Sequence, residues 1–402
     1  MEELRDVAII GVGMTKFGKS DKSVVELFAE AANQAMEDAG IVGKDVEALF
    51  VGNCFGGFYE GFMNMAPHLA WEIGAKTAPA FRLEGACASA TYAFILAWNW
   101  VASGMVDIAI AGGTERSMLP GTPYATRTFA MGAEKFESDC GMTFPGVFAT
   151  CAMLYSKTYD IPLEKLREMM AYVSIKNHKH GALNPKAQFY KKYGELKVED
   201  VINSRMIAYP LTLLDCCPFS DGASAVVLCS ADIARRFTDE PIYVLGVGAA
   251  SGGGLHRQED YIKPIARVTS ARKAFKMAGL SPDDIQYFEG HDCFTIAEII
   301  LLEACGFFEW GKAAKATMEG ETEIGGKIPT NISGGLIGKG HPVGCTGTAQ
   351  VYACVEQMLG KAVKGNQVTP PPEIAMTDNL GGDFASLGHI ILGRSKRSKY
   401  RR

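Results

Sequence analysis

A repeat with a spacing of 239 residues constrains the fold of this chain more than any other feature. Residues 35–41 read Ala-Met-Glu-Asp-Ala-Gly-Ile, and residues 274–280 read Ala-Phe-Lys-Met-Ala-Gly-Leu. Each copy is followed by an acidic loop and an apolar strand that begins at Val46 or at Ile285. A period this long is typical of duplicated domains and not of a solenoid. At 402 residues the chain also exceeds one ordinary hydrophobic core, so we expect two similar halves.

The order of predicted elements recurs in the two halves. In the first half, alternating strand-like and helical runs are expected at Val7–Val12, Ser23–Ala39, Val46–Val51, Asn64–Ile73, Ala78–Leu83, Cys87–Ser103 and Asp107–Ala111. In the second half they are expected at Tyr243–Val247, Ser270–Ala278, Ile285–Phe288, Phe294–Ala304, Cys345–Leu359, Ile374–Thr377 and Ser386–Leu392. This alternation predicts an α/β fold in which two sheets, each covered by helices, pack through their inner helices.

Residues 119–205 interrupt this order and are rich in Phe, Tyr, Met and Lys. We expect an inserted loop domain there. Residues 1–118 and 206–240 would then form the N-terminal half, and residues 241–402 the C-terminal half. An insertion over the cleft between two domains is a place where a long ligand can be held.

Composition and charge narrow the class of protein. A hydrophobic fraction of 48% with 21% charged residues predicts a globular protein with ample core, and a net charge of −5 gives no reason to expect a nucleic-acid partner. The acidic start indicates no signal peptide, and the eleven cysteines show no paired ligand spacing, so we expect reduced thiols in the cytoplasm.

The uncharged run between Glu84 and Asp107 could span a bilayer, but its small residues and Asn99 favour a helix buried in the core. The basic tail 394–402 is expected to be solvated, with contact to an acidic partner as the alternative.

Three segments carry candidate catalytic residues. Cys87 lies where a strand passes into the long apolar helix, and the unpaired N–H groups at a helix start favour a thiolate. On its position alone, Cys87 could equally be a buried core residue with no part in catalysis. His291 and Cys293 are two residues apart, so on extended backbone they face the same side, although a structural role is the alternative. A glycine-rich loop carries His341 to the start of another helix, without the spacing of a phosphate loop.

Other suggestive residues are interpreted as structural. Cys345 lies at the start of the last long helix and is expected to pack in the core. His178 and His180 lack a third ligand at matching spacing, so no metal site is expected. The pair Gly11 and Gly13 lacks the third glycine of a dinucleotide-binding motif.

These segments, in this order, resemble the thiolase family over nearly the whole chain. The segment around Cys87 resembles the family's nucleophile motif, Gly340–Gly344 matches its Gly-His-Pro-x-Gly motif, and Pro218–Ser224 resembles the segment that returns from the loop domain. Residues 291–294 read His-Asp-Cys-Phe in place of the usual Asn-Glu-Ala-Phe, and Asn379 replaces the cysteine of the usual Cys-x-Gly-Gly motif. Sterol-carrier-protein-type and archaeal-type thiolases share both departures.

The resemblance implies a thiolase-like duplicated αβαβα layered fold and an acyl-CoA C-acyltransferase that cleaves or forms a 3-oxoacyl-CoA. Cys87 would be the nucleophile and His341 its base. Cys293 would be the second base, and His291 would donate to the thioester oxygen or position a water.

The resemblance also implies substrates and partners. Backbone N–H groups of Cys87 and Gly381 would form an oxyanion hole, and Ser251 would contact substrate. Neither a metal nor another cofactor is expected, because coenzyme A is a substrate. A homodimer or higher oligomer is expected, with no membrane association, and the archaeal branch suggests a small zinc-ribbon and OB-fold partner protein. A thiolase-related aldolase or 3-oxoacyl synthase, and a non-catalytic acyl-CoA-binding scaffold subunit, are the alternatives.

Aromatic residues bear on the size of the acyl group. They gather at Phe55, Phe58, Tyr59 and Phe62, and in the insertion at Phe129, Phe136, Phe144 and Phe148. Packing of the loop domain and of a dimer interface is one explanation. If some of them line the acyl pocket, a bulky or aromatic 3-oxoacyl-CoA, such as a benzoylsuccinyl-type thioester, should be preferred to acetoacetyl-CoA.

Overall fold

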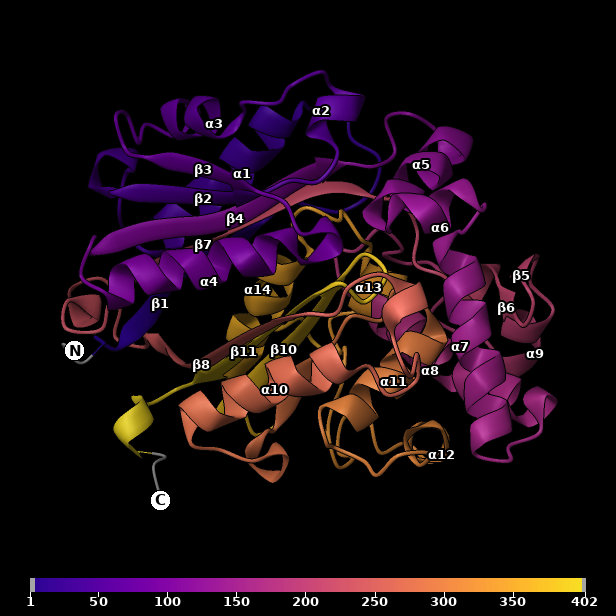
Figure 1. The fold of residues 1–402 in the computed structure, drawn as a ribbon. Helices are drawn as coiled ribbons and strands as arrows, with labels where there is room; N and C mark the ends of the chain where they lie inside the picture. Colours follow the sequence, from indigo (N-terminus) through magenta and orange to yellow (C-terminus); the bar gives the residue numbers. More distant parts are fainter. Residues whose placement is uncertain (1–3, 400–402) are drawn as a thin grey trace.

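Nine strands form one mixed sheet that runs through both halves of the chain (Figure 1). The computed structural model describes residues 4–399, except for the side chain of Arg397, so the predicted acidic start and basic tail lie partly outside the described residues. The N-terminal half contributes the order β3-β2-β4-β7-β1, and the C-terminal half continues it as β8-β11-β10-β9. The strands are β1 Val7–Met14, β2 Ala48–Gly52, β3 Ala80–Leu83, β4 Ile108–Arg116, β7 Asp221–Ser230, β8 Ile242–Ser251, β9 Tyr287–Glu289, β10 Ile374–Gly381 and β11 Ser386–Gly393.

Helices cover the sheet in layers, which confirms the predicted layered α/β fold (Figure 1). Two helices lie between the halves, α4 (Ser89–Ala102) and α14 (Thr346–Met358). The outer helices are α1 Val24–Asp38, α2 Gly56–Tyr59 and α3 Ala66–Glu72 in the first half, and α10 Ile265–Ala278, α11 Thr295–Ala304, α12 Ala313–Met318 and α13 Gly335–Lys339 in the second. The uncharged run after Glu84 forms α4, whose inner residues are buried as predicted. Among the described residues, no helix combines the length and the apolar character needed to cross a membrane.

The two halves share one hydrogen-bonded ladder, and the prediction of two separate sheets is wrong in this respect. Strands β1 and β8 lie antiparallel where the halves meet, and Ala8 pairs with Tyr243 and Ile9 with Ile242. Each of these strands is the edge strand of its half that faces the other half. Their extended backbones therefore come within hydrogen-bonding distance at one end. In the second half, the counterpart of β3 is reduced to a single bridge between Phe288 and Thr330.

The sequence repeat marks the same helix-to-strand contact in each half. A Cβ atom at Gly11 of β1 would lie 2.2 Å from the carbonyl oxygen of Ala35, and one at Gly246 of β8 would lie 2.3 Å from that of Ala274. Real Cβ atoms do not approach backbone this closely, so only glycine lets α1 and α10 pack directly on their strands. Gly11 therefore serves helix packing, and the repeated alanines are the helix side of that contact.

The insertion leaves the sheet after Arg116 and returns at Asp221. Its elements are α5 Thr122–Phe129, α6 Lys135–Asp139, α7 Phe144–Thr158, α8 Leu163–Leu183, α9 Val198–Ile202, β5 Met206–Ala208 and β6 Leu211–Thr212. Helix α8 is anchored in the core by Lys176, whose Nζ lies 2.7 Å from Oε1 of Glu298 on α11. Both side chains are at least 98% buried, so this ion pair fixes the insertion to the C-terminal half.

The inner helices α4 and α14 touch close to their first turns. A Cβ atom at Gly347 would lie 2.1 Å from Oγ1 and 2.6 Å from the backbone nitrogen of Thr91. The glycine therefore lets the two backbones come together at the centre of the molecule. The segments that precede both helices are brought to one place, and they contain Cys87 and His341.

Candidate active site

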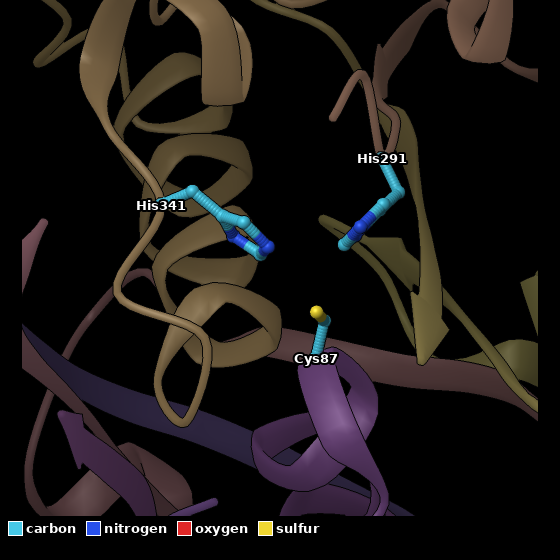
Figure 2. Close-up of side chains that lie close together, drawn as sticks. All are labelled: Cys87, His291 and His341. Atoms are coloured by element: carbon cyan, nitrogen blue, oxygen red, sulfur yellow. The ribbon is translucent and has the colours of Figure 1, made fainter. Parts of the chain in front are cut away.

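A cavity of about 610 Å³ lies between the two halves and beneath the insertion. Four of the predicted catalytic side chains line it: Cys87, His291, Cys293 and His341. The thiol of Cys87 and one nitrogen of each histidine lie within 4.8 Å of one another. In Figure 2, both imidazole rings point toward the sulfur from segments of the C-terminal half. The structure thus brings together residues that are more than 200 positions apart in the sequence.

Cys87 occupies a strained turn at the start of α4. It lies in a single 3₁₀ turn, Ala86–Ala88, and Ala86 has a φ of +49°, which is unfavourable for any residue with a Cβ atom. Ser89 stabilises the turn, since its hydroxyl accepts from the N–H of Gly85 at 3.0 Å and donates to the carbonyl of Ala86 at 2.6 Å. Such strain is typical of functional sites, and here it directs the sulfur into the cavity.

The resting sulfur is a thiol, contrary to the expectation of a thiolate. Burial raises the pKa of Cys87 to about 12, and the carboxylates of Glu115 and Glu84 add to the effect. The N–H of Gly382 faces the sulfur and lowers the pKa, but this contribution is smaller than the loss of hydration. Cys87 therefore needs a base that removes its proton as it reacts.

His341 is oriented to be that base. Its Nδ1 lies 2.7 Å from Oγ1 of Thr346, and this hydroxyl donates its own proton to the carbonyl of Pro342 at 3.1 Å. The hydroxyl can then only accept from the ring, so Nδ1 carries the proton and Nε2 is left free as an acceptor. Burial lowers the pKa of His341 to about 3, which keeps the ring neutral. The backbone N–H of His341 donates to Oγ of Ser220 at 2.8 Å and fixes the loop.

His291 is held by a buried ionic network. Its backbone N–H donates to Oδ2 of Asp378 at 3.3 Å. Asp378 also pairs with Arg267 at 3.0 Å and with Nε2 of His389 at 2.9 Å, and the side chains of these three residues are fully buried. Arg267 holds the pKa of Asp378 below its usual range, so the carboxylate stays charged. Burial lowers the pKa of His291 well below its usual value, and its ring is a neutral donor or acceptor beside His341, at a ring-centre distance of 5.0 Å.

Cys293 is the second thiol that the two halves bring to the cavity. It is buried, and its carbonyl accepts from the N–H of Cys217 at 2.9 Å. Burial and the nearby Cys87 raise its pKa well above the usual value. Asn379, which replaces the family's C-terminal cysteine, is buried and donates to Oε1 of Gln350 at 2.8 Å, and it does not line the cavity.

The predicted oxyanion donors are the N–H groups of Cys87 and Gly381, and a further N–H, that of Gly382, faces the sulfur. Gly381 packs so closely on the Cys87 turn that a Cβ atom there would lie 2.0 Å from the carbonyl of Gly85. This contact brings the next N–H, that of Gly382, to the sulfur. Ser251 lies exposed at the end of β8, paired with Ser386, and is not among the residues that line this cavity.

Other predicted residues lie apart from the cavity. Cys345 is fully buried, and no disulfide joins any of the eleven cysteines, all of which are described. His180 lies buried against Asn366 and Glu323, as a structural residue would. The thiol of Cys87 and the two imidazoles could also bind a soft metal ion, so the absence of a metal from the site stays a prediction.

The cavity wall is largely apolar and aromatic. Its aromatic residues are Phe129, Phe144, Phe148, Phe219 and Phe294. Of the predicted aromatics, Phe55 lies behind Phe129 at a ring-centre distance of 5.0 Å, and Phe136 is 64% exposed and outside the cavity. Ile207 and Leu213 line the cavity and are 38% and 45% exposed, so they mark its mouth, next to Arg205.

Known proteins resemble this chain over most of its length. Residues 7–232 match the N-terminal domain of thiolase, and residues 248–394 match the thiolase C-terminal domain-like family. Acetyl-CoA acetyltransferase of Methanothermobacter thermautotrophicus is 43% identical, over 97% of this chain and 100% of its own length. The benzoylsuccinyl-CoA thiolase subunit BbsB of Thauera aromatica is 35% identical, over 94% and 95%. The solved structure of the Ltp2-ChsH2(DUF35) aldolase has a TM-score of 0.82 at 27% identity, over 96% and 97%, and sterol carrier protein 2 sequences match as well.

The hydroxyl of Thr346 should control the reactivity of Cys87. Replacing it in Thr346→Val frees the His341 ring to adopt the wrong tautomer, so alkylation of Cys87 by iodoacetamide should slow by roughly 5- to 30-fold, the effect of one lost hydrogen bond. Mass spectrometry of the alkylated peptide gives the rate. Thr346→Ser should keep the parental rate of alkylation. Thr348→Val should keep it too, because it removes a buried hydroxyl of the same helix that does not contact His341. Alkylation of the valine variant at the parental rate would contradict the assigned tautomer.

Proposed function

The chain belongs to the thiolase family and is an acyltransferase, and from this premise we propose that Cys87, His341, Cys293 and His291 carry out its reaction on a 3-oxoacyl-CoA. Family membership confirms the resemblance predicted from the motifs, including the archaeal-type and sterol-carrier-protein-type branch. One observation supports the assignment most strongly: the thiol of Cys87 meets both imidazoles in a cavity that Cys293 also lines.

In the first half-reaction, Cys87 attacks the 3-oxo carbonyl while Nε2 of His341 takes its proton. Neither a thiolate nor an imidazolium is favoured alone in this desolvated site, so transfer and attack should occur together. The bond between the α-carbon and the 3-oxo carbon then breaks. The acyl group stays on Cys87 as a thioester, and the shortened acyl-CoA leaves as an enolate that takes the proton of Cys293.

In the second half-reaction, a new CoA thiol gives its proton to the Cys293 thiolate and attacks the thioester, and the departing sulfur of Cys87 takes back the proton that His341 holds. Run in reverse, Cys293 removes the α-proton of an acyl-CoA, and the carbanion attacks the acyl-enzyme. Two oxyanions develop at different points. The N–H of Gly382 faces the sulfur and would bind the oxygen of the acyl-enzyme, whereas His291 would donate to the thioester oxygen of the enolate. Each such donor is typically worth ~3 kcal/mol in the transition state.

The cavity offers room and apolar contacts for a bulky acyl group. It has a volume of about 610 Å³ and five aromatic side chains in its wall. The similarity to a relative named benzoylsuccinyl-CoA thiolase subunit supports an aromatic 3-oxoacyl-CoA as the substrate. Arg205, exposed at the mouth, is the cation that we assign to the phosphates of CoA. Coenzyme A is then the substrate, and no further cofactor enters the scheme.

We also propose a homodimer and a small partner protein. Strand β3 lies at one edge of the sheet, and Phe81 on it is 41% exposed and stacked on Phe50, so a second copy could extend the sheet there. The exposed Ile207 and Leu213 at the cavity mouth leave apolar surface for a zinc-ribbon and OB-fold partner. The Ltp2-ChsH2(DUF35) aldolase is named as an assembly with a second protein, which supports such a partner. Eleven free cysteines agree with a cytoplasmic location.

Cys87→Ala should abolish acyl transfer, because only the nucleophile is lost, while the fold and the affinity for CoA should change little. After exposure to an acyl-CoA, mass spectrometry of the parental enzyme should find the acyl group on the peptide that contains Cys87. Cys345→Ala is the matched control and should retain the adduct. An adduct on Cys345 would overturn the assignment.

Cys293→Ala should separate the two half-reactions. Self-acylation of Cys87 from a simple acyl-CoA should continue, but exchange of the α-proton with deuterated water should fall by about 10²- to 10⁴-fold, the usual contribution of a general base. Nuclear magnetic resonance of the recovered acyl-CoA measures the exchange. Cys216→Ala, which removes a neighbouring thiol of the cavity wall, should exchange at the parental rate. Parental exchange in Cys293→Ala would show that another group is the base.

Substrate and partner can be tested together. We expect kcat/KM to be higher for an aromatic 3-oxoacyl-CoA than for acetoacetyl-CoA, and to rise when proteins encoded beside this chain are co-expressed. Cleavage of a 3-hydroxyacyl-CoA without added CoA would instead indicate the aldolase alternative. Full activity of the isolated chain on acetoacetyl-CoA, with none on the aromatic thioester, would contradict both expectations.

A further inference from the structure

The turn between β10 and β11 is tied to the insertion by two buried carboxyl groups. Asp383, in the turn, is 2% exposed, and Glu137, on α6, is 7% exposed. The two side chains are hydrogen-bonded to each other. The backbone N–H of Glu134 also donates to Oδ2 of Asp383 at 3.4 Å. This contact joins segments that are almost 250 residues apart in the sequence.

A proton must lie between the two carboxyl groups for this contact to form. Oε1 of Glu137 accepts from the backbone N–H of His256 at 2.9 Å and from its Nδ1 at 3.0 Å. Nε2 of His256 accepts from Nε of Arg257 at 3.1 Å, so the histidine is the neutral tautomer with its proton on Nδ1. Oε2 of Glu137 is buried and finds no donor among the described residues. A protonated Asp383, within hydrogen-bonding reach of Glu137, would supply one.

This pair lies one residue from the N–H that faces Cys87. Gly382 precedes Asp383, and a Cβ atom at Gly382 would lie 2.3 Å from the carbonyl of Gly132 in the insertion. Phe384, which follows, has a φ of +67° and is fully buried, with its ring centre 5.4 Å from that of Phe148. The turn is therefore strained at Phe384 and packs against the insertion at Gly382, so it depends on the insertion to keep its shape.

We propose that Asp383 and Glu137 are positioning residues, which share one proton and thereby hold the N–H of Gly382 against the sulfur of Cys87. The proposal rests on the roles proposed for Cys87 and Gly382, but it concerns their geometry in the free protein. Neither carboxyl group lines the cavity, so both act through the turn.

The shared proton makes this positioning sensitive to pH. Burial and the neighbouring Glu137 raise the pKa of Asp383 to about 6. The folded state therefore binds a proton that the unfolded state releases, so this contribution to stability is complete below the ordinary pKa near 4 and is lost as pH rises through about 6. The titratable and charged groups that face the pair are Glu134, the residue before α6, His256 and Arg257 of the turn Leu255–Arg257, and, across Gly382, Cys87.

Two isosteric variants test the proposal without turnover. In Asp383→Asn, the amide donates to Glu137 at every pH, and in Glu137→Gln the amide donates to the ionised Asp383. The rate of Cys87 alkylation by iodoacetamide should match the parental rate at pH 5. Above pH 7 it should exceed the parental rate by roughly 2- to 12-fold, the range for one hydrogen bond. The melting temperature of the parental protein should decline between pH 4 and 7, and the melting temperatures of both variants should not.

Asp139→Asn is the matched control. Asp139 lies on the same helix, paired with Lys135 at the surface, and its loss should leave both profiles unchanged. In Asp383→Ala the contact is absent at every pH, so alkylation at pH 5 should be slower than in the parental protein. The proposal is overturned if the amide variants alkylate like the parental protein above pH 7, or if only the melting temperatures respond. If alkylation responds as expected but no thiolysis is found, the positioning stands and the proposed function fails.

Discussion

The contact between the first turns of the two inner helices is the constraint on which the active site depends. Gly347 and Thr91 let α4 and α14 meet backbone to backbone at the centre of the molecule. The nucleophile precedes one helix and its base precedes the other, so their separation is set by this contact and not by any loop. The N-terminal half supplies the nucleophile Cys87 and the C-terminal half supplies its base His341, so this pair exists only where the two halves meet.

Loss of hydration governs the chemistry of the site more than helix dipoles do. It keeps Cys87 a thiol and His341 and His291 neutral, even though Cys87 stands at a helix start. The protein offsets the same loss at Asp378 with a buried arginine, and that carboxylate stays charged. The charged carboxylate of Asp378 therefore holds the backbone of His291, whereas the side chains that react are uncharged until substrate enters. Electrostatic stabilisation of the developing oxyanions is strong in such surroundings, because few waters compete for the donors.

Much of the fold could be predicted from the sequence, because the 239-residue repeat and the alternation of apolar runs are local signals. Cys87, His291, Cys293 and His341 could be singled out because each lies at the junction of a predicted strand or loop with a helix, but their catalytic roles came from the resemblance of these segments to the thiolase motifs. The junction of β1 with β8 could not be predicted, since two residue pairs leave no pattern in the sequence. Thr346 was missed because its importance depends on the hydroxyl's other bond, to Pro342. The position of the Gly382 N–H at the sulfur could not be predicted either, because it depends on a close backbone contact that only coordinates reveal.

The high pKa of Cys87 has a consequence for the lifetime of the protein. Burial raises the pKa of Cys87 far above neutral pH, so the thiol form dominates in the idle protein. Peroxides and electrophilic metabolites react with thiolates far faster than with thiols, so an idle molecule is protected from the damage that would inactivate it. Cys87 becomes a good nucleophile only as His341 takes its proton, so the reaction with a bound carbonyl group is favoured over reactions with solutes that approach an idle molecule. A chain with ten further thiols, most of them buried, can in this way keep its nucleophilic sulfur chemically intact between turnovers.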